Sequence, residues 1–299
     1  MEGRQPALGV LGEDDGVSPR VLVALSLVAV VGAGCGSDDR PESAGAPTAA
    51  GSSTSTSASP TQAPPPPPAP DRGACYRLSY DKAVAPTSDD QPVGCDKPHT
   101  SQTYAVGRLD TTVDGHLVAV DSATVQKQVA AACPKKLAGY LGGTDKDLQL
   151  SLLRPVWFTP TVEQSDRGAA WYRCDVIAVA GDEKLAKITG DLKGALGRPK
   201  SHDDYAMCAT DQPGTPDFQR VPCGEGHSWK AITTIDLTKL AKNGSYPGPD
   251  AVQGAGDHVC ADAARAIAAD ALNYQWGYEW PTKAQWLAGQ TYGRCWAPD

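Results

Sequence analysis

The chain has 299 residues and a formal net charge of −8 at pH 7, and no run of lysine or arginine residues interrupts this acidity. Such a length has room for two ordinary domains, and the charge disfavours nucleic acid as a partner. The chain contains nine cysteines, and their positions are the strongest indication of its domain organisation.

An apolar run lies near the start of the chain, where residues 21–31 read VLVALSLVAVV. It is too short to span a bilayer as a helix and is typical of the centre of a signal peptide. The small residues G-A-G precede Cys35, as a lipoprotein signal peptidase requires. We therefore predict a lipoprotein signal peptide over residues 1–34 and lipidation of Cys35, with palmitate among the acyl groups. The alternatives are cleavage nearby, with Cys35 incidental, or an uncleaved short helix.

The residues before the apolar run do not fit a signal peptide, because Glu13, Asp14 and Asp15 make them acidic. The start of a signal peptide is normally positively charged. A start at Val17, with Arg20 as the only charge before the apolar run, would remove this conflict.

Residues 35–70 are rich in Ser, Thr, Ala, Gly and Pro and end in PPPPPAP. A segment with so few bulky apolar residues buries too little surface to offset the entropy of ordering. We predict a disordered tether, flexible in its Ser/Thr part and stiffened by polyproline II structure at its end. It would hold the folded part of the protein away from the membrane.

The other eight cysteines form two sets of four with similar spacing, which predicts an internal duplication. Copy 1 covers residues 71–182, copy 2 covers residues 205–299, and residues 183–204 form the linker between them. The ends of the two copies align without gaps, with six identities in fifteen positions and Trp171 opposite Tyr292. The identical pairs are Pro160/Pro281, Thr161/Thr282, Gln164/Gln285, Gly168/Gly289, Arg173/Arg294 and Cys174/Cys295.

Each copy contains one strong helix pattern. In copy 1, Asp121 or Ser122 can cap a helix that places Val125, Val129, Cys133 and Leu137 on one face. In copy 2 an alanine-rich helix follows Asp257. Strand-like segments follow the second cysteine and surround the fourth, and Pro160 and Pro281 suit the first position of a short helix. The predicted fold class is therefore α+β: two tandem copies of a small disulfide-stapled domain, each with one main helix on a small, mostly antiparallel sheet.

Cysteines in even number in an exported domain are expected to be oxidised. Confining the pairs to each copy leaves nine of the 105 possible pairings. We favour first with second and third with fourth, because the latter would fasten the helix to the last strand. The predicted disulfides are Cys75–Cys95, Cys133–Cys174, Cys208–Cys223 and Cys260–Cys295.

Two pairs of polar residues are candidate binding residues. Cys-x3-His occurs in both copies and ends at His99 and His227, but a zinc site needs three or four ligands, and these cysteines are expected in disulfides. We expect the histidines to order the turn into the next strand, and we predict no metal site and no cofactor. Arg173 and Arg294 could bind an anion or a partner. Alternatively, they could stack on aromatic rings or pair with carboxylates, and we favour this structural role because it recurs in both copies.

No catalytic constellation stands out. The sequence lacks C-x-x-C and G-x-S-x-G, and nothing singles out two carboxylates for glycoside cleavage. We predict a protein that is not an enzyme.

Several of these motifs resemble the septum formation family of exported proteins from high-GC Gram-positive bacteria. The resemblance rests on G-A-C-Y at Cys75, V-G-C-D-K-P-H-T at residues 93–100, a helix cysteine, and the terminal W-Y-R-C and Y-G-R-C. Copy 2 lacks the proline before its histidine, and both copies lack the acidic residue that the family usually carries soon after it. The resemblance implies an envelope protein linked to division, with no catalytic residues to carry over.

The expected function is that of a non-catalytic binding or scaffold module on the extracytoplasmic face of the cell membrane, acting at the division septum. It would be anchored to the membrane through its N-terminal lipid and would contact an unknown envelope protein or cell-wall polymer. The alternatives are a cell-wall hydrolase or hydrolase regulator, and a small-molecule-binding lipoprotein with a deep pocket between the domains.

Overall fold

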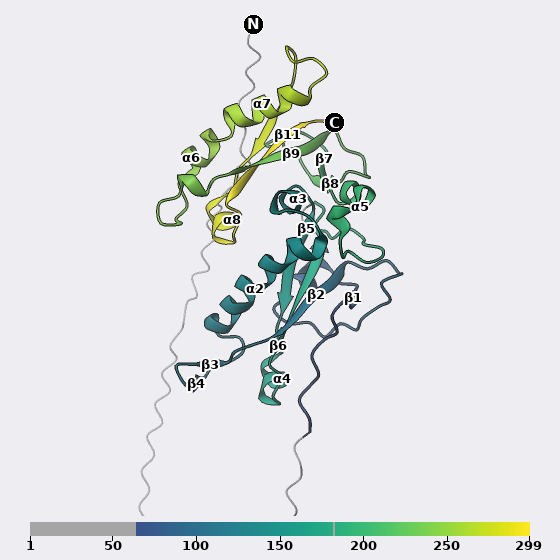
Figure 1. Ribbon diagram of the computed structural model, residues 1–299, viewed down its shortest axis with the longest axis vertical. Coiled ribbons are helices and arrows are strands. Elements are labelled where there is room, and N and C mark those ends of the chain that lie inside the picture. Colours follow the sequence, from purple (N-terminus) through teal and green to yellow (C-terminus); the bar gives the residue numbers. More distant parts are fainter. Residues whose placement is uncertain (1–63, 182) are drawn as a thin grey trace, which may run out of the picture. The chain divides into compact units, whose positions relative to one another are not determined.

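The computed structural model describes residues 64–181 and 183–299 (Figure 1). The predicted signal peptide, Val17, Cys35 and most of the predicted tether lie outside the described residues. Among the described helices, none is long and apolar enough to cross a membrane.

Copy 1 is built on a four-stranded antiparallel sheet in the order β1-β2-β6-β5. A small hairpin, β3–β4, lies outside this sheet. The strands are β1 (Cys75–Tyr76), β2 (Ser101–Arg108), β3 (Thr112–Val113), β4 (His116–Leu117), β5 (Leu153–Phe158) and β6 (Trp171–Ala178).

The helix predicted for copy 1 is α2 (Ala123–Leu141), which packs across β2, β5 and β6 (Figure 1). Of the two predicted caps, Ser122 is the one used, and its side chain accepts from the amide of Val125. Every fourth residue from Val125 to Leu141 is fully buried, which confirms the predicted apolar face. The other helices of copy 1 are α1 (Tyr80–Ala83), α3 (Asp145–Gln149) and α4 (Val162–Asp166).

Copy 2 repeats this sheet in the order β10-β11-β9-β7, with one further strand, β8, at the edge beside β7. The strands are β7 (Met207–Ala209), β8 (Arg220–Pro222), β9 (Trp229–Asp236), β10 (Gly277–Glu279) and β11 (Tyr292–Pro298). The helical segments are η2 (Thr238–Leu240), α6 (Pro249–Gly254), α7 (Asp257–Ile267) and α8 (Lys283–Leu287). The predicted α+β duplication is therefore confirmed.

All four disulfides join the predicted partners. Cys133–Cys174 fastens α2 to β6, and Cys260–Cys295 fastens α7 to β11 in the same way. The third cysteine falls on the apolar face of each helix because that face packs against the strand that carries the fourth cysteine.

The P-T-x-x-Q motif forms a helix cap in both copies, but its proline is not the first helical residue as we expected. Thr161 and Thr282 are the N-caps, so each proline lies one position before the cap. The threonine hydroxyl accepts a hydrogen bond from the backbone amide of the glutamine, and the side-chain oxygen of the glutamine accepts one from the backbone amide of the threonine. This reciprocal arrangement is a capping box, which explains why Thr and Gln recur together.

Residues 183–204 join the copies but are more than a linker. They contain η1 (Ala195–Gly197) and α5 (Pro199–Asp204), and Ile188, Leu192 and Ala195 are almost completely buried. Because charged and glycine residues surround these positions, the sequence shows no regular apolar pattern there, and we did not predict that they are buried.

The two copies share one hydrophobic core. Leu152 and Leu153 of copy 1 belong to the same buried cluster as Met207, Trp229 and Trp296 of copy 2. The copies also exchange backbone hydrogen bonds. The amide of Leu152 donates to the carbonyl of Tyr205 (2.9 Å), and the amide of Met207 donates to the carbonyl of Leu150 (2.9 Å).

Candidate functional site

Arg173 lies in the interior of copy 1, with only 2% of its surface exposed. Because side chains alternate along β6, it points to the face opposite the Cys174 disulfide. Its guanidinium lies between the rings of Tyr76 (4.0 Å from the centroid) and Phe158 (4.4 Å). It also forms an ion pair with Asp175, at 3.2 Å between Nη2 and Oδ2. These contacts match the structural role favoured from the sequence.

Asp175, the carboxylate partner in this ion pair, is fully buried. Its carboxylate accepts hydrogen bonds from the hydroxyls of Ser101 (2.8 Å) and Thr103 (2.7 Å) on β2. Burial raises the pKa of Asp175, and the nearby Arg173 guanidinium and the two hydroxyls counteract this only in part.

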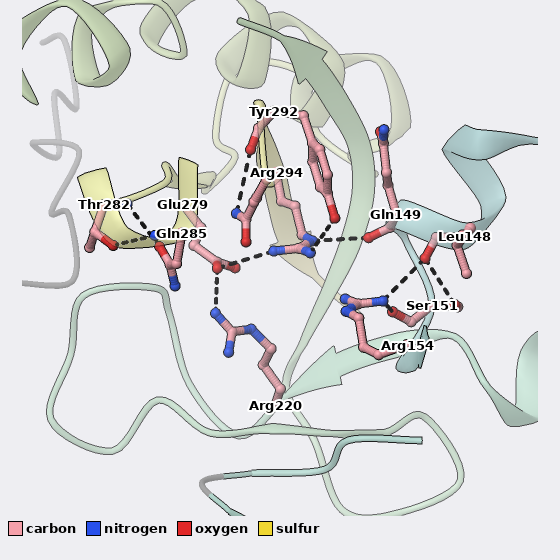
Figure 2. A network of polar contacts seen from close by, with 11 residues as sticks. Leu148, Gln149, Ser151, Arg154, Arg220, Glu279, Thr282, Gln285, Tyr292 and Arg294 are labelled. Atoms are coloured by element: carbon pink, nitrogen blue, oxygen red, sulfur yellow. Dashed lines mark hydrogen bonds and ion pairs between the residues drawn. The ribbon is translucent and has the colours of Figure 1, made fainter. Parts of the chain in front are cut away.

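Arg294 occupies the equivalent place in copy 2 and is equally buried, at 2% exposed. Its partner is Glu279 on the neighbouring strand β10, at 3.2 Å between Nη1 and Oε1 (Figure 2). Arg220 binds the same Glu279 oxygen. Burial raises the pKa of Glu279, but the guanidiniums of Arg220 and Arg294 outweigh that effect and leave the pKa below its usual value.

Arg294 also reaches across to copy 1. Its Nε donates to the carbonyl of Gln149 (2.9 Å), the last residue of α3, and its Nη2 contacts the Tyr292 hydroxyl (3.0 Å) (Figure 2). The last carbonyls of a helix have no partner within the helix, and a cation suits the negative end of its dipole. Arg294 therefore helps to join copy 2 to copy 1.

Arg154 of copy 1 approaches the same end of α3. Its Nη1 donates to the carbonyls of Leu148 (3.3 Å) and Ser151 (2.9 Å) (Figure 2). Burial, together with repulsion from Arg294, lowers the pKa of Arg154 to about 10, so the side chain remains cationic at neutral pH. Two arginines from different copies thus converge on one helix end.

The two histidines order their turns, as we expected. Nδ1 of His99 contacts the carbonyl of Lys97 (2.9 Å), and Nδ1 of His227 contacts the carbonyl of Glu225 (2.8 Å). His99 is buried, whereas His227 is partly exposed and its Nε2 lies 3.1 Å from Oδ2 of Asp299. The Glu225 carbonyl and the Asp299 carboxylate raise the pKa of His227.

One group of potential metal ligands occurs among the described residues. Atoms of Cys208, His227 and Asp299 lie within 4.8 Å of one another. The sulfur of Cys208 is bonded to Cys223 and is not a thiolate, so this group lacks the third strong ligand that a zinc site needs.

A cavity of about 680 Å³ lies where the connecting segment meets copy 2. One wall is formed by residues 184–187 and Thr189, and the other by Val221, Pro222, Gly224 and Glu225, at the end of β8 and in the turn after it. The lining is completed by Leu152, Ala180, Gly181, Asp204, Tyr205 and Gln219. Lys184 and Lys187 are exposed on the first wall, and Glu225 is exposed on the second, so both signs of charge border the cavity.

The structure thus places Arg173, Arg294 and His99 inside the protein and brings Arg294 together with two arginines that we did not single out. Asp175 could have been noticed two residues after Arg173, on the same face of a predicted strand. No pattern in the sequence pointed to Glu279, Arg220 or Arg154, because they meet through contacts between distant segments.

Comparison with known proteins gives one result. The model of the family described as septum formation matches residues 44–168 and again residues 156–295. No curated protein and no solved structure matches the chain. The two matches together cover most of the chain and agree with the duplicated fold, so the protein belongs to the septum formation family.

Proposed function

We propose that the protein is an envelope lipoprotein that serves as a non-catalytic binding or scaffold module at the division septum. The observation that carries this proposal is the fusion of the two family domains through a shared core. Four disulfides and the Arg294 contacts further restrict the movement of this body. A rigid body loses little entropy when it binds, which favours a role in recognition.

The shared core changes how the duplication would act in binding. Two independent heads on one tether would gain affinity through effective concentration. Two copies joined by buried contacts instead present one fixed surface to a partner in the envelope. The partner is another envelope protein or a cell-wall polymer.

The anchor in this proposal is lipidated Cys35, which is supported by the apolar run and the small residues before it. Metabolic labelling with an alkyne analogue of palmitate tests it. We expect label on the wild-type protein and none on C35A. Equal labelling of both would rule out Cys35 as the anchor.

Live imaging tests the place of action, with a fluorophore that matures outside the membrane fused to the C-terminus. Enrichment at the septum is the expected result, and a uniform membrane signal would contradict a role in division. Zymography on peptidoglycan tests the absence of catalysis, since a clearing band from the purified protein would contradict it.

The cavity of about 680 Å³ favours a second candidate function, the binding of a small molecule. Its volume lies within the range of roughly 300–1,000 Å³ that is common for ligand sites. Equilibrium dialysis against envelope extracts, followed by mass spectrometry, would identify a retained compound if this function is correct.

A further inference from the structure

The cavity wall formed by residues 184–189 is an extended segment that pairs along only one of its edges. On that edge, the amide of Ala180 donates to the carbonyl of Lys184 (3.0 Å), and the amide of Ala186 donates to the carbonyl of Ala178 (2.8 Å). Ile188 and His99 exchange two hydrogen bonds, of 2.8 and 3.0 Å. The segment therefore pairs with the copy 1 sheet through two isolated β-bridges, Leu185 with Val179 and Ile188 with His99.

The backbone groups on the other edge of this segment have no backbone partner among the described residues. In an extended chain, the backbone groups of successive residues point to opposite sides, so those of Leu185, Lys187 and Thr189 point away from the sheet. Within the described residues, these three make no backbone hydrogen bond. All three line the cavity.

On the opposite wall, several backbone groups of residues 220–222 already have hydrogen-bond partners. The carbonyl of Arg220 accepts from the amide of Gly181, and Val221 pairs with Cys208 inside the sheet. Pro222 has no amide hydrogen, and its carbonyl accepts from Glu225 (2.9 Å). Among the described residues that line the cavity, Leu185, Lys187 and Thr189 thus offer backbone donors and acceptors without a backbone partner.

We propose that residues 185–189 bind an extended polypeptide segment of another envelope protein as an additional β-strand. This inference rests on the proposed binding function and specifies its partner. A peptide offers amides and carbonyls that alternate at the spacing of this edge, which is the basis of binding by strand addition. A glycan lacks that repeat. The proline run at residues 64–68 is not the occupant, because proline has no amide hydrogen to donate.

Charge narrows the class of peptide. Lysine on a strand edge discourages indiscriminate pairing, and an acidic residue opposite it on an added strand forms a favourable cross-strand pair. The exposed Lys187 on this edge therefore favours an acidic residue directly opposite it on the added strand, whereas the exposed Asp204 and Glu225 elsewhere in the lining disfavour further acidic residues.

Amide hydrogen exchange of the full-length protein, followed by NMR, tests the edge itself. In the free protein we expect slow exchange at Ala186, Ile188 and Gly190, and fast exchange at Leu185, Lys187 and Thr189. Slow exchange at all six amides would overturn the proposal, because the edge would then already be occupied.

Selection from a displayed library of short random peptides tests the ligand. Selected peptides should share an Asp or Glu at one position and should protect the amides of Leu185, Lys187 and Thr189 from exchange. K187P removes one cavity-facing amide and should raise Kd about tenfold or more. K187A keeps the backbone and is the matched control, for which a rise of less than about fivefold is expected.

Thermal unfolding of K187P shows whether that variant is folded. If K187P is not folded, T189P is used in its place, because it removes the amide hydrogen of Thr189 on the same edge. Peptides that bind without protecting this edge, or that bind K187P as well as K187A, would overturn the proposal. Binding of soluble peptidoglycan fragments but of no peptide would overturn it as well, yet leave the binding function standing. Septal imaging tests that function separately.

Discussion

The two copies bury an arginine at the same point of the fold but neutralise it differently. In copy 1, Arg173 pairs with Asp175 on its own strand, and in copy 2, Arg294 pairs with Glu279 on the neighbouring strand. Asp175 has one guanidinium and a raised pKa, whereas Glu279 has two and a lowered pKa. The duplicated fold therefore fixes the position of the buried arginine, whereas the residues packed around each arginine determine which strand supplies its carboxylate partner.

What covers each arginine explains the difference. Behind the copy 1 sheet, a small buried cluster is formed by residues of copy 1 alone: Tyr76, Leu78, Ala83, Phe158 and Ile177. On the corresponding face of copy 2, Trp296 packs into the core shared with copy 1, and Arg294 contacts Gln149. The same face of one fold thus closes on itself in the first copy and joins the two copies in the second.

The largest expected effect comes from R173M. This change leaves Asp175 buried without its cation, and breaking a buried pair in this way costs about 3–5 kcal/mol. Urea denaturation should show that loss in the free energy of unfolding. The double variant R173M/D175N should recover much of it, and a single variant within about 1 kcal/mol of wild type would show that the pair contributes little.

Removal of a helix–strand disulfide tests whether the copies unfold together. C133A/C174A and C260A/C295A open loops with separations of 41 and 35 residues, so each should cost about 4 kcal/mol on the loop-entropy model. Because the core is shared, calorimetry should show a single transition at a lower temperature for either variant. Two separate transitions, with only the altered copy shifted, would contradict the shared core.

R294M should cost less than R173M, about 2–3 kcal/mol, because Glu279 keeps Arg220 while the bond to Gln149 is lost. Since that bond joins the copies, limited proteolysis of the segment between them should be faster in R294M than in wild type. In R173M its rate should equal that of wild type when the proteins are compared under conditions that give them the same free energy of unfolding. A larger loss of stability in R294M than in R173M would reverse the expected order of the two arginines.

The capping boxes should behave alike in both copies. T161A and T282A each remove the side chain that accepts from the third helical amide, at a cost of about 1 kcal/mol. T161S and T282S keep the hydroxyl and should stay close to wild type. Chemical denaturation of the four variants compares the copies directly, and a difference above about 1 kcal/mol between the alanine variants would show that the boxes are not equivalent.

The smallest effect concerns His227, which is partly exposed. Its folded pKa is raised, so its contribution is fully present below the unfolded value of about 6.5 and is lost as the pH rises through the folded pKa. H227Q should therefore lower stability by less than about 1 kcal/mol at acid pH and by almost nothing at about pH 9. Stability of H227Q that falls below wild type only at high pH would contradict the sign.

The sequence alone was enough for the duplication, the main helix of copy 1 and the disulfide pairs. These features are encoded in short-range patterns: cysteine spacing, an apolar residue at every fourth position, and identities between the two ends. It failed at residues 183–204, where Ile188 and Leu192 alternate with charged and glycine residues and carry no clear period. Only their packing shows that they belong to the core.

The tertiary structure decided the remaining points. Arg154, Arg220, Glu279 and Arg294 come from segments far apart in the chain, and only the fold brings them together. The unpaired edge at residues 185–189 likewise depends on which neighbours take the backbone bonds of alternate residues. Local patterns in a sequence encode local geometry, whereas the partners of a buried charge or a strand edge are set by contacts that only the complete fold creates.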